Sequence, residues 1–486
     1  MYGREPAFRR SIEAFLCAVG IACVLASGGC ATTDSRRELA NHTAAKVQQS
    51  NHDSAGVQQI SIADVAKPSH PDEIVDVDST PDVVAAVSDE YVDSLPSLEA
   101  SAIQQNPALR RLTQQWEAAR SKIGYVDGLP DPKLAANFFV SPIETAAGAQ
   151  RANLSVSQMI PWLERLDAKQ QQACFEAMAL QQQVAAEQLR IVADLRELWY
   201  RLYFLERQIE ISAANQLLIK DLIDVANARV ATGKAAQGDV LAGTLEYSRV
   251  EEQLVTLKQQ RESTVAALNR VVGRPADTPV SVPSEIGVPL PDSDHSQLRD
   301  LAFQYQPLIQ SARIRTQATR WGVEVARLQR RPDIGVSASW FEIDSNRPRP
   351  NIVDVGQDAW SLGASITIPL WDKKYNAIEN EARWLHAAAH ASVTGLQQQF
   401  DAKLLDLWQQ AVAANETATL YQDTIVPQAR DTLEADQQAY STGTVEFDRV
   451  IRDVRAVLTL QIGYHRAVAQ LATALARIEQ ATGTHF

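Results

Sequence analysis

The densest group of charged residues in the sequence lies near the carboxyl end, directly after Gly443. Acidic and basic side chains are interleaved there, at Glu446, Asp448, Arg449, Arg452, Asp453 and Arg455. On a helix, opposite charges three or four places apart lie on one face and can form ion pairs. A solvated helix face explains such a run equally well. The corresponding stretch of the first half carries Asp239, Glu246 and Arg249.

Histidines and methionines give little support for a metal site. His386 and His390 are four residues apart, so a helix would place both imidazoles on one face, but no third ligand lies one turn away. Ordinary surface histidines are the better interpretation. Three further histidines lie in a polar stretch and are expected to be solvated: His42, His52 and His70. With only three Met, the chain has no thioether series for copper.

Motifs for covalent chemistry or nucleotide binding are missing from the sequence. It has no Gly-rich phosphate loop, no Ser/His/Asp order with a local signature and no paired-Cys metal motif. We therefore expect neither a cofactor nor an enzymatic activity, and any energy-driven process would depend on a partner.

Composition predicts a long helical protein. The 486 residues include 46 Lys+Arg and 59 Asp+Glu, and a net charge of −13 argues against nucleic acid as a partner. Apolar residues make up 45% of the chain, enough for sizeable cores, whereas only 21 Gly and 21 Pro interrupt it. Few breaks and many helix-forming residues favour a mainly α fold.

The amino terminus has the features of an export signal. Basic residues precede an apolar run over 15–26, which is too short to span a bilayer at about 20 residues. We expect residues 1–29 to be a signal peptide. The residues before Cys30 resemble a bacterial lipoprotein box, which predicts lipidation of Cys30; an ordinary signal peptide cut nearby is the alternative. We expect the polar stretch 30–94 to be a flexible tether.

The remainder of the chain is an internal duplication. Pro107 and Pro307 are 200 positions apart, and Pro161 and Pro369 are 208 apart. The Thr-Gly pairs Thr232-Gly233 and Thr442-Gly443 are 210 apart. Residues 95–285 and 286–486 are therefore expected to be two copies of one structural unit.

Each unit should contain a long helical hairpin. No Gly or Pro lies between Pro161 and Gly233, and a helix of that length would reach about 105 Å. Each Thr-Gly pair interrupts the helical pattern as a helix C-cap does, and another helical run follows at once. The two pairs therefore predict the tips of two antiparallel hairpins: Thr232, Gly233, Thr442 and Gly443.

Two alternating segments per unit predict β-strands. Apolar residues occupy every second position over 360–368, 334–340 and 153–157, against small or polar residues, and only 133–141 follows the pattern less cleanly. Such strands suit a transmembrane barrel with lipid outside and a wet lumen, and a soluble one-sided sheet would give the same pattern. Four strands cannot close a barrel, so membrane-spanning strands would require several copies of the chain.

The duplicated order of helix, strand, strand and long hairpin, with proline after the second strand as in SQMIPW and TIPLWDKK, resembles TolC-type outer-membrane efflux proteins. The resemblance covers nearly all of residues 95–482, and GLPDPKL, SQMIPW and LNRVVGRP are most similar to the branch serving heavy-metal exporters of the resistance-nodulation-division type. It implies a homotrimeric α/β-barrel channel in outer-membrane lipid, supplied through a periplasmic adaptor by an inner-membrane proton-driven pump. Its cargo would be metal cations or small toxic compounds.

Such a duct needs a gate, and the converging hairpin tips are the natural place for it. The candidates are Asp239, Asp448, Arg449, Arg452 and Asp453. Relatives commonly carry an aspartate nine residues after the turn glycine, where this chain has Arg452, so a gate of mixed charge is expected. The rival interpretation of the whole chain is a periplasmic adaptor or coiled-coil scaffold, although adaptors usually have one hairpin and several β modules.

Overall fold

The computed structural model describes residues 94–145, 147–344 and 356–484. The expectations for the signal peptide, for Cys30 and for the tether before residue 94 lie outside the described residues. Elements of the first half, in chain order, are α3 (Leu95–Gln105), α4 (Pro107–Ile123), β1 (Lys133–Thr145), β2 (Gly148–Ile160), α5 (Leu163–Ala231) and α6 (Gln237–Val272). The second half repeats the order with α7 (His295–Tyr305), α8 (Pro307–Leu328), β3 (Asp333–Asp344), β4 (Ala359–Thr367), α9 (Asp372–Leu420), α10 (Val426–Thr442) and α11 (Phe447–Thr482). The mainly α, duplicated fold expected from the sequence is confirmed.

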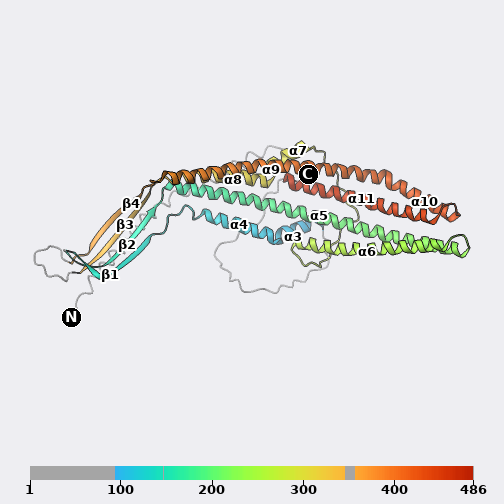
Figure 1. Ribbon diagram of the computed structural model, residues 1–486, viewed down its shortest axis with the longest axis horizontal. Helices are drawn as coiled ribbons and strands as arrows, with labels where there is room; N and C mark the ends of the chain where they lie inside the picture. The colour runs from blue at the N-terminus through green and yellow to red at the C-terminus, as the bar shows by residue number, and fades with distance from the viewer. Residues whose placement is uncertain (1–93, 146, 345–355, 485–486) are drawn as a thin grey trace. The chain divides into compact units, whose positions relative to one another are not determined.

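Two long antiparallel hairpins dominate the described chain (Figure 1). Helix α5 has 69 residues and would be about 100 Å long at the usual rise. It turns at Thr232 and Gly233 into α6, and α10 turns at Thr442 and Gly443 into α11. Both glycines have positive φ, 69° and 88°, a left-handed conformation that glycine adopts without the Cβ penalty.

The second hairpin contains a break that the sequence analysis did not predict. A π-helical turn, Tyr421–Ile425, separates α9 from α10, and Pro427 follows in the first turn of α10. Proline cannot donate a helical hydrogen bond and its ring crowds the preceding turn, which explains why the regular helix changes there. The ring of Tyr421 lies against Gly463 of α11, where an added Cβ would come within 2.9 Å of it.

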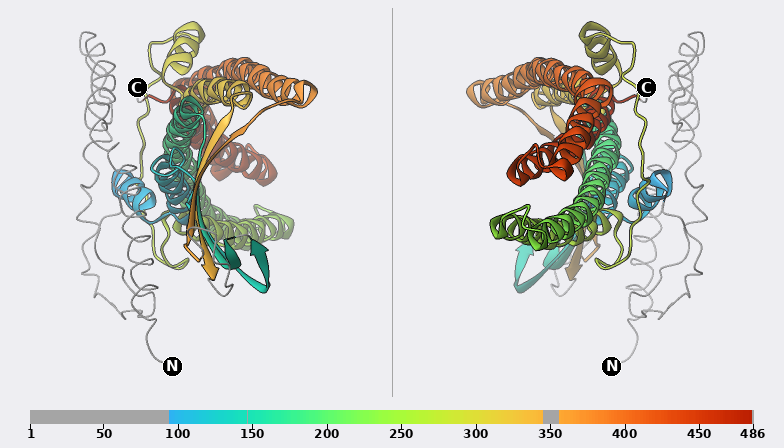
Figure 2. Two further views of the ribbon diagram at one scale, coloured as in Figure 1. Left: turned by 90° about the vertical axis from the view of Figure 1, so that its left-hand side faces the viewer. Right: turned by 90° about the vertical axis from the view of Figure 1, so that its right-hand side faces the viewer.

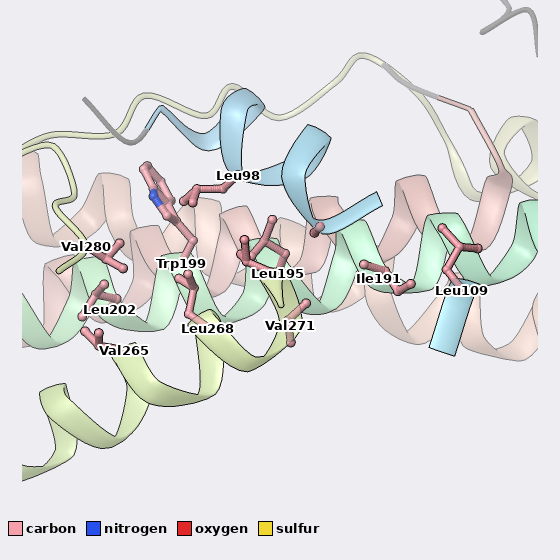
Figure 3. Close-up of a cluster of buried hydrophobic side chains, with 12 residues drawn as sticks. Leu98, Leu109, Ile191, Leu195, Trp199, Leu202, Val265, Leu268, Val271 and Val280 are labelled. Carbon is pink, nitrogen blue, oxygen red and sulfur yellow. The ribbon is translucent and has the colours of Figure 1, made fainter. Parts of the chain in front are cut away.

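The helices pack as one curved layer, with α3 and α7 on its convex side (Figure 2). Under α3, Leu98 contacts a buried cluster that includes Leu195 and Trp199 of α5 (Figure 3). Under α7, Leu298 belongs to a second cluster with side chains of α9 and α11, among them Leu475. Because these short helices bury apolar faces on the long ones, the two halves of the layer are built alike.

The junction at the end of each hairpin is the same in both halves. Helices α6 and α11 end at Gly273 and Gly483, with φ of 87° and 79°. The side chain of Asn106 donates to the carbonyl of Val271 at 3.0 Å, and that of Gln306 donates to the carbonyl of Gln480 at 2.7 Å. Each kink between two short helices is thereby fixed to the last turn of a long helix.

We expect Gly483→Ala to lower the thermal unfolding midpoint of the purified protein. The positive φ costs alanine about 1–2 kcal/mol, and its Cβ would lie only 2.9 Å from the carbonyl oxygen of Tyr305. The control is Gly395→Ala, inside α9 with open space around it, which should raise the midpoint slightly because alanine favours helix by about 0.5–1 kcal/mol. Circular dichroism on heating compares the two; equal midpoints would contradict the role of this junction.

The four strands form one antiparallel sheet in the order β1-β2-β3-β4. Leu134, Val156, Ala338 and Leu362 pair in one row across it, and the next row joins Ser155, Ser339 and Ser361. Paired residues lie on the same side of a sheet and successive residues on opposite sides. The alternation read from single strands therefore continues across all four strands, giving one apolar face and one small polar face.

Candidate functional site: hairpin ends and strand sheet

The tips of the two hairpins share one hydrophobic core. It draws Ile219 and Ala226 from α5, Val250 from α6, Tyr440 from α10 and Phe447 from α11. Gly243 of α6 lies so close to Ile223 and Phe447 that a Cβ there would come within 2.7 Å of the isoleucine. Movement of one tip therefore requires repacking against the other.

Two of the expected gate residues, Arg449 and Asp453, interact with Asp436, a residue that was not among the candidates from the sequence. Asp436 of α10 is buried and accepts a hydrogen bond from Nε of Arg449 at 2.7 Å. Burial raises the pKa of Asp453, and the neighbouring Asp436 raises it further. The hydrogen bond from Asp453 lowers the pKa of Asp436, and Arg449 adds to this effect. Of the two carboxyl groups, that of Asp453 therefore binds a proton more readily than that of Asp436.

Asp448 and Arg452 form no ion pair with any other helix that the structure describes. They pair with each other along α11 at 3.0 Å, and both side chains are largely exposed. An exposed pair of this kind contributes little to stability, about 0.3–0.5 kcal/mol. Within one copy of the chain, these two residues lie on a solvated helix face, which was one of the two interpretations of this charged run. Their side chains are available for contacts with other molecules.

The link between the hairpins is made instead by Glu246, whose position in the sequence showed it only as a counterpart of the charges after Gly443. Its side chain is 5% exposed although it is acidic. From α6 it accepts hydrogen bonds from Arg455 of α11 and, at 3.5 Å, from Arg249. A buried carboxylate needs such partners, and here one partner belongs to the other hairpin.

Arg229 makes a second link, close to the turns. Its guanidinium lies 4.4 Å from the ring centroid of Tyr440, and its Nη2 donates to the carbonyl of Lys234 at 3.2 Å. Burial raises the pKa of Tyr440, and the negative charge of Asp239 contributes in the same direction. Asp239, in the first turn of α6, thus has an electrostatic effect on Tyr440 of the second hairpin. No spacing rule pointed to Arg229 or Asp436, because their partners lie on other helices.

The sheet leaves most of its apolar face and both of its edges uncovered within one copy of the chain, although Trp340 on the same face is buried. Leu134 is 71% exposed, Phe138 77% and Leu362 90%, values far outside those of a sheet packed on a core. Among the described residues, β1 pairs only with β2 and β4 only with β3. Exposed apolar faces and open strand edges of this size indicate contact with another apolar phase and with other strands.

His386 and His390 lie next to each other on α9. Their rings contact each other at 4.8 Å, and Nδ1 of His386 lies 3.0 Å from the hydroxyl of Thr319. The described part of the chain contains no group of three residues that could hold a metal ion. None of the described helices combines the length and apolar character needed to cross a bilayer.

The duplicated hairpins and the two-faced sheet define a protomer of the outer-membrane channel type, and comparisons with known proteins agree. The family described as Outer membrane efflux protein matches residues 98–274 and again 298–484. The chain therefore belongs to the outer membrane efflux protein family, whose members are channels and not enzymes. This membership decides against the periplasmic adaptor. No curated protein matches the chain.

Several solved structures share the fold. The outer-membrane channel OprN superposes with a TM-score of 0.69 at 18% identity, covering 80% of this chain and 90% of OprN. The outer membrane protein VceC from Vibrio cholerae gives 0.68 at 20% identity, with 81% and 96% covered. The open state of the Neisseria gonorrhoeae MtrE outer membrane channel gives 0.66 at 16%, with 80% and 89% covered. At these identities the likeness establishes the fold.

Proposed function

We propose that the protein is the outer-membrane channel of a tripartite efflux system. It acts as a passive conduit for solutes that an inner-membrane proton-driven pump and a periplasmic adaptor deliver. The observation that carries this function is the sheet, most of whose apolar face is exposed and whose two outer edges are unpaired among the described residues. An open strand edge is not tolerated in lipid, so the sheet has to close with other copies.

Three copies satisfy this requirement. A homotrimer supplies twelve strands from three four-stranded sheets, with the apolar row through Leu362 facing lipid and the serine row through Ser361 facing the lumen. The long helices continue the passage into the periplasm. Cys30 carries lipid in this proposal and adds an anchor to the outer membrane.

The gate lies at the periplasmic hairpin turns, marked by Thr232, Gly233, Thr442 and Gly443. Asp448 and Arg452, exposed on α11, face neighbouring copies around the axis. Arg449, Asp453 and Asp239 act within the copy, through Asp436 and Tyr440. Closure at the tip therefore combines contacts between copies with contacts between the two hairpins of one copy.

Membrane fractionation tests this function. We expect the protein in the outer-membrane fraction, soluble only with detergent and migrating as a trimer, and we expect ion conductance when it is added to planar bilayers. A version with Cys30→Ala and a cleavable signal peptide separates the lipid anchor from the sheet. It should still require detergent, and a soluble monomer would overturn the proposal.

A further inference from the structure

A groove of about 670 Å³ lies between α5, α9 and α11, away from the hairpin tips and from the sheet. Its floor is apolar, formed by Phe204 of α5, Leu407 and Ala414 of α9 and Ala469 of α11. Its volume falls within the roughly 300–1,000 Å³ typical of sites for small molecules. Gln410, Thr417 and Gln470 add hydrogen-bonding groups.

The groove is positively charged in a chain whose net charge is −13. Three arginines line it against the single acidic residue Glu197. Arg477 is already occupied, since it pairs with Asp194 at 2.8 Å and with Glu197. Arg201 and Arg466 are exposed, and no acidic side chain of the described residues pairs with either of them. The guanidinium of Arg466 lies 5.6 Å from the centroid of the Phe204 ring.

The charge of Arg477 also acts on Lys403 of α9, which lies outside the residues that line the groove. Burial lowers the pKa of Lys403 on α9, and the positive charge of Arg477 lowers it further. Arg201 and Arg466 have no acidic partner among the described residues, and Arg466 lies over the ring of Phe204. Together with the small apolar residues of the groove, they match a ligand that is acidic at one end and apolar at the other.

The groove opens on the side of the layer opposite α3 and α7. Leu195 and Trp199 face α3, and at 100° per residue Glu197, Arg201 and Phe204 lie on the other side of α5. The same holds on α11, where Leu471, Leu475 and Ile478 belong to the cluster under α7 and Arg466 and Thr473 line the groove. This is the concave side of the layer (Figure 2).

We propose that this groove binds amphipathic organic anions, holding the acidic group on Arg201 and Arg466 and the apolar body on Phe204 and the alanine floor. If the protein is the trimeric conduit proposed above, the concave side encloses the passage, and three such grooves surround it. A free metal cation would be repelled there, so among the candidate cargoes the groove favours small organic anions.

Binding is tested directly with 1-naphthalenesulfonate, by equilibrium dialysis against the full-length protein in amphipol. We expect Arg201→Gln and Arg466→Gln each to weaken binding about tenfold, because each removes a charge-assisted hydrogen bond. Arg201→Lys, which keeps the charge, should retain part of the affinity. The control Arg299→Gln removes an equal charge on α7, where Arg299 pairs with Asp300 at 3.2 Å, and should change nothing.

The neutral analogue 1-naphthalenesulfonamide separates charge from apolar contact. It should bind the wild type more weakly, and the arginine substitutions should not affect it. Equal binding of both probes, or equal affinity in wild type and Arg201→Gln, would overturn the anion site. Block of the single-channel current by the sulfonate is measured alongside. A protein that conducts ions but does not bind the sulfonate would contradict only this inference. A protein that binds the sulfonate but conducts no ions would support the anion site and contradict the proposed conduit.

Discussion

Arginine in place of Leu362 is expected to abolish assembly of the protein in the outer membrane. Leu362 is the fourth residue of β4, it is 90% exposed in the protomer, and it lies in the apolar row of the sheet. On the lipid side of a barrel strand, arginine costs about 2–4 kcal/mol near the middle of the bilayer. A trimer carries this cost three times, about 6–12 kcal/mol in all. This sum is comparable to the whole free energy of unfolding of a typical protein, about 5–15 kcal/mol.

The neighbouring residue provides a matched control. Ser361→Arg places the same side chain one position earlier on the same strand, on the polar face with Ser339. We expect this variant to assemble and to shift the ion selectivity of the channel, because its charge is in water. Membrane fractionation with native electrophoresis scores both variants. If Ser361→Arg fails to assemble and Leu362→Arg succeeds, the two faces have been assigned the wrong way round.

The elements of this fold were predictable because they depend on local patterns. Three local patterns carry the prediction: the absence of Gly and Pro over α5, the Thr-Gly cap at each turn, and the period of two in the strands. Each depends only on residues that are close together in the sequence. The pairing of β2 with β3 brings the two halves together and could not be read from either half. The break at Tyr421–Ile425 depends on one proline inside a helical pattern, a signal that predicts a disturbance but not a π-helical turn.

The candidate site was predicted less completely, for a physical reason. Asp448 and Arg452 were found because their spacing is regular along one helix. Glu246 and Arg455 meet across two hairpins, more than 200 residues apart in sequence, and Asp436 meets Arg449 across a turn. Contacts of this kind depend on how the helices pack. Burial of an acidic residue, which marks both Glu246 and Asp436, is visible only in three dimensions.

Glu246→Ala is expected to open the periplasmic end of the channel. The substitution removes the carboxylate that joins α6 to α11 and leaves Arg455 without this partner. Breaking a fully buried pair costs about 3–5 kcal/mol. Arg455 is 45% exposed, so solvent reduces the loss to roughly 1–2 kcal/mol per copy. Over three copies, about 3–6 kcal/mol would shift the ratio of open to closed tips by a hundredfold or more.

Single-channel recording in planar bilayers measures this shift as higher conductance or longer openings. Glu252→Ala is the control, because Glu252 is an exposed acidic residue on the same helix. Arg455→Gln should open the tip in the same direction, and the double variant should add little, because both substitutions remove one shared contact. Additive effects would mean that Glu246 and Arg455 act through different partners. Unchanged recordings in both single variants would mean that the core around Phe447, and not this ion pair, keeps the two hairpins together.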